Sequence, residues 1–408
     1  MALFILCLAA MPAWAEENTS AGLKQELRDI HQQLRIIGQQ LQIRLDTIEK
    51  RLDRMEGAGK AAAVKAKKPR LSIRRKPAAG QAAALTVCRQ GCDYADLNRA
   101  IKALKSGGTI TMKPGLSGTC GVIDKPLKLV GLKDKNGRRA HLAGGICWGK
   151  APLVVRAANV TITGLEISNA VVRDRNGACI RIDPEAADLL IDDLYCHDSE
   201  NGILGGPRRG GVTVINSLFE RNGRGGRAHG LYINGGDVLT IRNTRILSSK
   251  GQGHTLKTGA RRTIVEDSVL AALDGKNSRA IDAYAGGELI VRRSVLQQSK
   301  NTDNHEFIGV ALESRRINPA PHSTTLEENW FIYDDQERCC RWLLFAKLFG
   351  PFIIRNNRMV GLTGVHLPSI ENQVRARNSF FKDRDEAGLP VYDGTLASLP
   401  KPGGFPRK

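Results

Sequence analysis

Aromatic residues are scarce in this 408-residue chain, at 5% of the total, and the chain lacks any apolar run of about 18 residues or more. The missing run argues against an integral membrane protein. Cysteine pairs of the CxxC type are absent too, which disfavours a zinc site built on Cys88 and Cys92. Glycine, by contrast, supplies 43 residues, and with so few aromatics it predicts short strands and tight turns rather than a large helical core.

Negative charge is in deficit, because 61 Lys and Arg face 41 Asp and Glu, for a formal net charge of +20. Such an excess predicts a polyanionic partner: nucleic acid, an anionic glycan or an anionic envelope surface. Nucleic acid is disfavoured because no pattern of stacking aromatics accompanies the basic residues.

The first fifteen residues predict a secretory signal peptide, with an apolar run from Leu3 to Ala10 and the small-x-small signature Ala13-Trp14-Ala15. No Lys or Arg follows Met1, which is atypical, so whether the peptide is cleaved stays open. We therefore expect a periplasmic or secreted protein. Eight cysteines remain, enough for up to four disulfides whose pairing the sequence leaves open: Cys88, Cys92, Cys120, Cys147, Cys179, Cys196, Cys339 and Cys340.

Residues 16–56 carry apolar residues three and four apart, which predicts a coiled-coil helix with one stutter near Leu41 to Leu45. Burial of this stripe favours a homo-oligomer, with packing against the chain's own domain as the alternative. The next segment, residues 57–85, is rich in Ala, with eight Lys and Arg and no acidic residue. It predicts a disordered, solvated linker that either contacts an anionic envelope peripherally or only stays soluble.

Residues 86–380 contain a six-residue unit of the form apolar-x-polar-x-x-apolar, repeated at intervals of 23 to 35 residues. The units begin at Ile162, Ile191, Val214, Ile241, Val265, Val291, Leu326 and Ile354. This period predicts an all-β parallel β-helix with three short strands per turn, in which the polar residue forms a bend and a stacked ladder. Asp96 is expected to cap a short helix, Leu97 to Lys105, at the start, and residues 381–408 form a tail containing Pro and Gly.

The start of this domain resembles a known family. Cys92-Asp-Tyr-Ala-Asp-Leu-Asn-Arg-Ala-Ile, Gly107-Gly-Thr-Ile-Thr-Met-Lys-Pro-Gly and Pro126-Leu-Lys-Leu-Val-Gly-Leu are similar to the first coils of right-handed parallel β-helix proteins of the pectin-lyase-like superfamily. The resemblance covers about residues 86–380 and is specific for fold. It implies a right-handed parallel β-helix, but the superfamily includes lyases, hydrolases, epimerases, esterases and adhesins without activity.

Three consecutive coils can be aligned on the strand that follows each polar turn. The alignment stacks His229, His254 and Arg279 in one column and Tyr232, Lys257 and Asp282 in another. With Leu231, Leu256 and Ile281 in the core, strand alternation places the second column on the outside. The first column has the parity of the core, so it reaches the outside only if the adjoining turn redirects it.

These side chains suit β-elimination of a polyuronate, which needs a cation at the C5 carboxylate, a base for the C5 proton and an acid for the leaving oxygen. Arg279 would neutralise the carboxylate, and Tyr232 or His229 would donate the proton. Of the two candidate bases, His254 is favoured over Lys257, because the neighbouring Asp282 raises the pKa of a lysine. A glycoside hydrolase needs a second carboxylate, and structural ladder contacts are the alternative for the whole stack.

Two arginine-containing segments flank the stack, and we expect Arg208, Arg209, Arg224 and Arg227 either to line a basic groove for an anionic chain or to form ordinary turns. No cofactor is required. A metal alternative remains, with His229 and His254 as ligands, or with calcium among Asp183, Asp192, Asp193, Asp198 and Glu200.

The sequence thus predicts an exported carbohydrate-active protein that acts on an acidic, uronate-containing polysaccharide, foremost as a lyase. The alternatives are a glycan-binding or envelope-scaffold protein without activity, a uronate epimerase and a glycoside hydrolase.

Overall fold

The computed structural model describes residues 82–304, 306–313, 317–319, 321–334, 342–346, 350–362 and 373–403. The predicted signal peptide, the coiled coil, most of the basic linker and Cys339-Cys340 lie outside these residues. Within them, no helix has the length and apolar character needed to cross a membrane.

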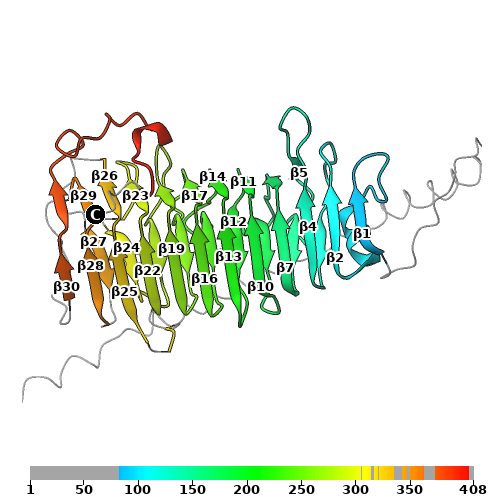
Figure 1. Ribbon diagram of the computed structural model, residues 1–408, viewed down its shortest axis with the longest axis horizontal. Coiled ribbons are helices and arrows are strands. Elements are labelled where there is room, and N and C mark those ends of the chain that lie inside the picture. The colour runs from blue at the N-terminus through cyan, green and yellow to red at the C-terminus, as the bar shows by residue number, and fades with distance from the viewer. Residues whose placement is uncertain are drawn as a thin grey trace, which may run out of the picture. The chain divides into compact units, whose positions relative to one another are not determined.

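The described chain winds into a parallel β-solenoid whose short strands form three sheets, stacked coil upon coil along one axis (Figure 1). All the strand pairs are parallel, as the sequence predicted. The first sheet has twelve described strands: β1 (Ala82–Val87), β2 (Leu104–Met112), β4 (Leu127–Gly131), β7 (Ala158–Thr163), β10 (Ala187–Asp192), β13 (Gly211–Ile215), β16 (Val238–Arg242), β19 (Arg262–Glu266), β22 (Glu288–Arg292), β25 (Ser323–Glu327), β28 (Phe352–Arg355) and β30 (Gln373–Ala376).

The other two sheets complete each coil. The second sheet has ten described strands: β5 (Ala140–Ala143), β8 (Leu165–Ser168), β11 (Tyr195–His197), β14 (Leu218–Glu220), β17 (Arg245–Leu247), β20 (Val269–Ala271), β23 (Val295–Gln298), β26 (Trp330–Tyr333), β29 (Arg358–Val360) and β31 (Ser379–Phe381). The third has nine described strands: β3 (Gly121–Ile123), β6 (Leu153–Val155), β9 (Ala178–Ile182), β12 (Asn201–Gly205), β15 (Leu231–Ile233), β18 (Leu256–Thr258), β21 (Ile281–Ala283), β24 (Glu306–Val310) and β27 (Trp342–Ala346).

The register of the sheets confirms the predicted repeat unit. Its first apolar residue stacks from coil to coil, so Ile191 lies opposite both Ile162 and Val214. Its fifth residue does the same, with Tyr195 opposite Glu166 on one side. The first residues are buried and form the continuous core of the solenoid.

The middle residue of each unit forms the bend between the first and second sheets, in the left-handed backbone region. Positive φ angles occur at Gly164, Asp193, Asn216, Asn243, Asp267, Arg293, Glu328 and Asn356. Gly, Asn and Asp tolerate this region best, which explains most of these choices. Some bend residues form the predicted ladder, since Asn243 Nδ2 donates to Asn216 Oδ1 at 2.8 Å. The residue that follows the bend forms a second ladder: the backbone N–H of Ser268 donates to Ser294 Oγ at 3.2 Å, and that of Ser294 donates to Asn329 Oδ1 at 3.0 Å.

One end of the solenoid is covered by a short helix, α2 (Leu97–Ala103). The Asp96 side chain accepts from the backbone N–H of Arg99 at 2.7 Å, which confirms the predicted cap. Leu97 and Ile101 are buried against the first coils, so the helix shields the core from water. The helix ends two residues earlier than predicted because the chain enters β2 at Leu104, and β1 already begins at Ala82, inside the segment expected to be linker.

Three disulfides connect Cys88 with Cys92, Cys120 with Cys147, and Cys179 with Cys196. The first pair therefore forms a disulfide, and the zinc alternative for these two cysteines is wrong. Cys179 and Cys196 are fully buried, so the third disulfide ties two strands together inside the core.

Residues 381–403, the described part of the predicted tail, pack on the outside of the solenoid (Figure 1, red). This C-terminal segment includes a 3-10 helix, η1 (Leu396–Ser398), and Leu399 is buried with Leu247 and Val269 of the second sheet. Arg384 pairs with the buried Asp334 and anchors the segment.

Candidate active site

The predicted outer column lies on three adjacent strands of the third sheet. Tyr232 of β15 lies opposite Lys257 of β18, which lies opposite Asp282 of β21. Leu256 and Ile281, one residue earlier on their strands, are fully buried in the core. The alignment of the three coils is therefore correct.

The histidine column also forms, because the imidazoles of His229 and His254 stack with centroids 5.2 Å apart. Both rings turn toward the outer column: His229 meets the ring of Tyr232 edge-on, and His254 Nε2 lies 3.3 Å from Asp282 Oδ2. The turn before each strand thus redirects this column, as its placement required.

Hydrogen bonds determine the tautomer of both histidines. His229 Nδ1 accepts from the backbone N–H of His254 at 3.0 Å, and His254 Nδ1 accepts from that of Arg279 at 3.1 Å. In the neutral ring the proton then lies on Nε2, so neither ring keeps a free lone pair. Burial lowers the pKa of His229 to about 3 and holds that of His254 well below its usual range. Neither the base role expected of His254 nor the metal-ligand role of the two rings fits this arrangement.

Lys257 lies beside two tyrosine rings, with its Nζ 5.5 Å from the centroid of Tyr232 and 5.0 Å from that of Tyr284. The two rings contact each other edge-on, with centroids 5.9 Å apart. Its ammonium forms ion pairs with Asp282, at 3.7 Å, and with Glu313. The two carboxylates differ in environment, since the side chain of Glu313 is 42% exposed and that of Asp282 only 4%.

The carboxylate of Asp282 is only partly satisfied. Its Oδ1 has no hydrogen-bond partner among the described residues and lies 3.9 Å from Arg279. Burial raises the pKa of this group, while Lys257 and Arg279 oppose the shift. Arg279 itself donates from Nε to Glu306 at 2.7 Å. Its charge is therefore already neutralised, so it is a poorer partner for a substrate carboxylate than predicted.

Three residues of this cluster were missing from the sequence prediction: Tyr284, Glu306 and Glu313. Tyr284 follows Asp282 by two residues, so alternation alone places it on the same face. Glu306 begins β24 and Glu313 lies beyond it, where the interval between repeat units lengthens, so no alignment pointed to them.

A cavity of about 490 Å³ adjoins the cluster, and Tyr284 belongs to both. Arg208 and Arg261 line it together with Asn234 and Asn318. Of the four arginines predicted to bind substrate, Arg208 alone lines this cavity.

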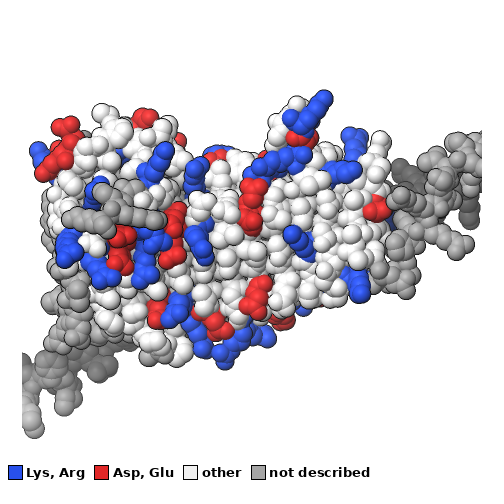
Figure 2. All heavy atoms as spheres, viewed as in Figure 1, with Lys and Arg blue, Asp and Glu red and all other residues white. Residues whose placement is uncertain are grey.

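The remaining arginines are placed differently. The side chain of Arg209 lies near Asp237, at 3.8 Å. Arg224, which pairs with the buried Glu200 at 2.6 Å, and the exposed Arg227 precede β15, whereas Arg208 follows β12. The two arginine segments thus lie at opposite ends of the strands of the third sheet, on either side of the stack. In the view of Figure 2, basic and acidic side chains are interspersed rather than gathered in a stripe of one sign.

The acidic residues considered for calcium do not form a metal-binding group in the described structure. Most are held by basic partners instead: Asp183 by Arg156, Asp193 by Arg139, Asp198 by Arg221 and Glu200 by Arg224. Asp192 accepts a hydrogen bond from Asn216.

No protein-family model and no curated protein matches the chain. Among solved structures it is similar to an alginate lyase from Paenibacillus sp. str. FPU-7, with a TM-score of 0.45 and 15% identity over 73% of this chain and 98% of that one. It is also similar to ORF18 of Geobacillus virus E2, with a TM-score of 0.47 and 16% identity over 73% of this chain and 62% of that one.

Proposed function

We propose that this β-helix protein acts on an acidic, uronate-containing polysaccharide by β-elimination, at the row Tyr232, Lys257 and Asp282. The observation that carries the proposal is the environment of Lys257. Its ammonium lies beside two tyrosine rings, is held from inside by the buried Asp282, and on the outside contacts the partly exposed carboxylate of Glu313.

Glu313 occupies the position that a substrate carboxylate would take. Because Glu313 is the more exposed of the two partners of Lys257, an arriving uronate displaces it more readily than Asp282. The ammonium then neutralises the C5 carboxylate and stabilises the charge that develops as the C5 proton leaves. Arg208 at the cavity would bind a neighbouring uronate of the same chain.

The proton transfers are assigned to Tyr232. The two histidines have no free lone pair, and the ammonium of Lys257 is committed to carboxylates. The phenolate form of Tyr232 would take the proton from C5 and, as the resulting phenol, donate it to the leaving oxygen when both lie on one face of the sugar. One residue then serves as base and acid and returns to its starting form.

Export is part of the proposal. Three disulfides in the described residues suit an oxidising compartment, and the predicted signal peptide would direct the chain there. The predicted coiled coil of residues 16–56 would assemble several copies.

The test is incubation of the full chain with a panel of uronate polysaccharides, following the ultraviolet absorbance of the unsaturated ends that elimination creates. Tyr232→Phe and Lys257→Ala should each lower the rate by about 100-fold or more. Lys276→Ala, at an exposed position, is the control and should keep full activity. Absorbance that rises equally with Tyr232→Phe would contradict the proposal.

A second candidate is a glycan-binding or scaffold protein without activity. It is favoured by the ion pairs within the whole cluster, where Lys257, Arg279 and Asp282 already have oppositely charged partners and are at most 16% exposed. Binding of a polysaccharide without unsaturated product, unchanged in Lys257→Ala, would select this candidate.

A further inference from the structure

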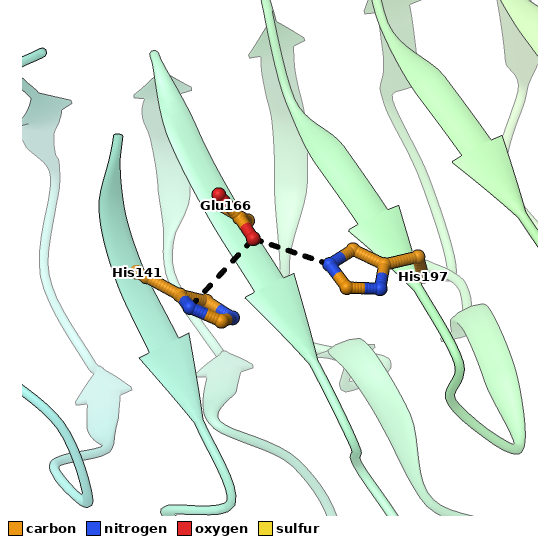
Figure 3. A group of neighbouring side chains, drawn as sticks. All are labelled: His141, Glu166 and His197. Atoms are coloured by element: carbon orange, nitrogen blue, oxygen red, sulfur yellow. Dashed lines mark hydrogen bonds and ion pairs between the residues drawn. The ribbon is translucent and has the colours of Figure 1, made fainter. Parts of the chain in front are cut away.

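A second cluster of chemically active side chains lies on the second sheet, outside the candidate active site. His141 of β5, Glu166 of β8 and His197 of β11 come from three neighbouring strands. Figure 3 shows both imidazoles directed toward the Glu166 carboxylate. Leu142 and Ile167, which follow His141 and Glu166 on their strands, are buried in the core. Because side chains alternate along a strand, the cluster itself lies on the outer face.

The distances within the cluster match those of metal ligands. Glu166 Oε1 lies 3.2 Å from His197 Nε2 and 3.7 Å from His141 Nδ1, and all three ligand atoms lie within 4.8 Å of one another. Ligand atoms about 2.0–2.1 Å from a tetrahedral zinc ion are about 3.4 Å apart. An ion would therefore fit among these atoms with little movement.

The outer nitrogen of each ring has a partner that can accept a hydrogen bond, as is usual for metal-bound histidines. His197 Nδ1 lies 2.8 Å from Asp198 Oδ2, and His141 Nε2 lies 2.9 Å from Ser168 Oγ. Asp198 also accepts a hydrogen bond from Arg221 at 2.9 Å. A proton on each outer nitrogen leaves a lone pair on each inner one, facing Glu166.

With the protons on the outer nitrogens, this arrangement favours a positive charge at its centre. Two nitrogen lone pairs and a carboxylate oxygen that converge repel one another unless a proton or a cation lies between them. A cation satisfies all three groups at once.

We propose that His141, Glu166 and His197 bind a zinc ion. Two imidazoles and one carboxylate suit zinc, whereas calcium prefers ligand shells made of oxygen only. Three protein ligands leave a coordination position open, and His141 and Glu166 line a cavity of about 820 Å³ with Tyr195 and Arg138. The open position therefore faces a space that admits a ligand, and the chemical class that suits it is an anionic oxygen.

The test is calorimetric titration of zinc chloride into the full, oxidised chain after dialysis against a chelator. One zinc per chain should bind, and His141→Ala and Glu166→Gln should each weaken it by at least about 100-fold, with Ser168→Ala weakening it by about 10-fold or more. His322→Gln is the control, because His322 accepts from the backbone N–H of Gly287 at another edge of the solenoid. Circular dichroism of each variant verifies its fold.

Cobalt substitution of the unaltered chain gives an independent reading, because visible absorption bands of Co²⁺ report nitrogen ligation in a site of low coordination number. These bands are expected, and zinc should abolish them. Absence of saturable zinc binding, equal binding by His141→Ala, binding of calcium in preference to zinc, or cobalt bands typical of six oxygen ligands would each overturn the proposal.

Discussion

The imidazole of His229 accepts a hydrogen bond from the backbone N–H of His254, at 3.0 Å from Nδ1, and the two rings stack 5.2 Å apart. A side chain of one coil thus satisfies the backbone of the next. His254 repeats the contact with Arg279, so the column holds three coils together only while the rings are neutral.

This dependence predicts a loss of stability in acid. Burial lowers the pKa of His229 to about 3, below its unfolded value of 6.5. The unfolded chain therefore binds the proton first, and the contribution of His229, present above about pH 6.5, is lost as the pH falls toward 3. Between about pH 7 and pH 5 we expect about 2 kcal/mol of unfolding free energy to be lost through His229.

Urea unfolding at the two pH values measures this loss, and His229→Gln should reduce the difference because glutamine keeps an acceptor but does not titrate. The same pH difference in both proteins would show that His229 does not carry the effect.

Replacing a residue of the ladder that follows the bends should lower the stability of the protein. Asn329 Oδ1 accepts from the backbone N–H of Ser294 at 3.0 Å, and its Nδ2 donates to the carbonyl of Val291 at 2.8 Å. Asn329→Ala leaves both buried groups unpaired and should lower the unfolding free energy by at least about 2 kcal/mol. Asn136→Ala, in an exposed loop, is the control for urea unfolding. Equal midpoints for the two variants would be inconsistent with a stabilising ladder.

Removing the buried disulfide should also lower the stability of the protein. Cys179 and Cys196 close a loop with a sequence separation of 17, so replacing both with Ala should lower stability by about 3 kcal/mol through the entropy of the unfolded chain. Peptide mapping without reduction checks the pairing, and thermal unfolding measures the cost. Recovery of a Cys179 peptide joined to any cysteine other than Cys196 would contradict the pairing.

The ion pair that anchors the C-terminal segment is buried, so its contribution to stability can be compared with that of an exposed ion pair. Arg384 is 11% exposed and Asp334 3%, so Arg384→Ala leaves a buried carboxylate without its partner and should cost about 3–5 kcal/mol. The matched control is Arg262→Ala, whose pair with Glu288 is 47% and 25% exposed and should contribute less than about 1 kcal/mol. Similar losses in both variants would mean that the anchor is not buried in solution.

If the proposed function holds, the cavity determines which arginines contact substrate. Arg208→Ala should raise KM severalfold with kcat nearly unchanged, because Arg208 lines the cavity beside Tyr284. Arg227→Ala, at the opposite end of the strands, should leave both constants unchanged. The reverse pattern would place the substrate at that end.

The repeat unit alone determined the fold. Each of the eight units has an apolar residue at its first position and a bend residue at its third, and several have a polar residue after the bend. These are local features, so each coil can be recognised without knowledge of the others. Because parallel coils stack position on position, the alignment also determined which residues of β15, β18 and β21 share a column.

Only the tertiary structure decided what those columns do. Glu306 and Glu313 reach the cluster from a stretch where the repeat interval lengthens, and they take up the charges of Arg279 and Lys257. The hydrogen bonds that remove the lone pairs of His229 and His254 involve backbone groups of the next coil. The repeat alignment places Glu166 opposite Tyr195. His141 lies before the first aligned unit, so the alignment could not bring it into the second cluster. Convergence of side chains depends on how the connections between strands direct them, and these connections vary in length, since the repeat interval ranges from 23 to 35 residues.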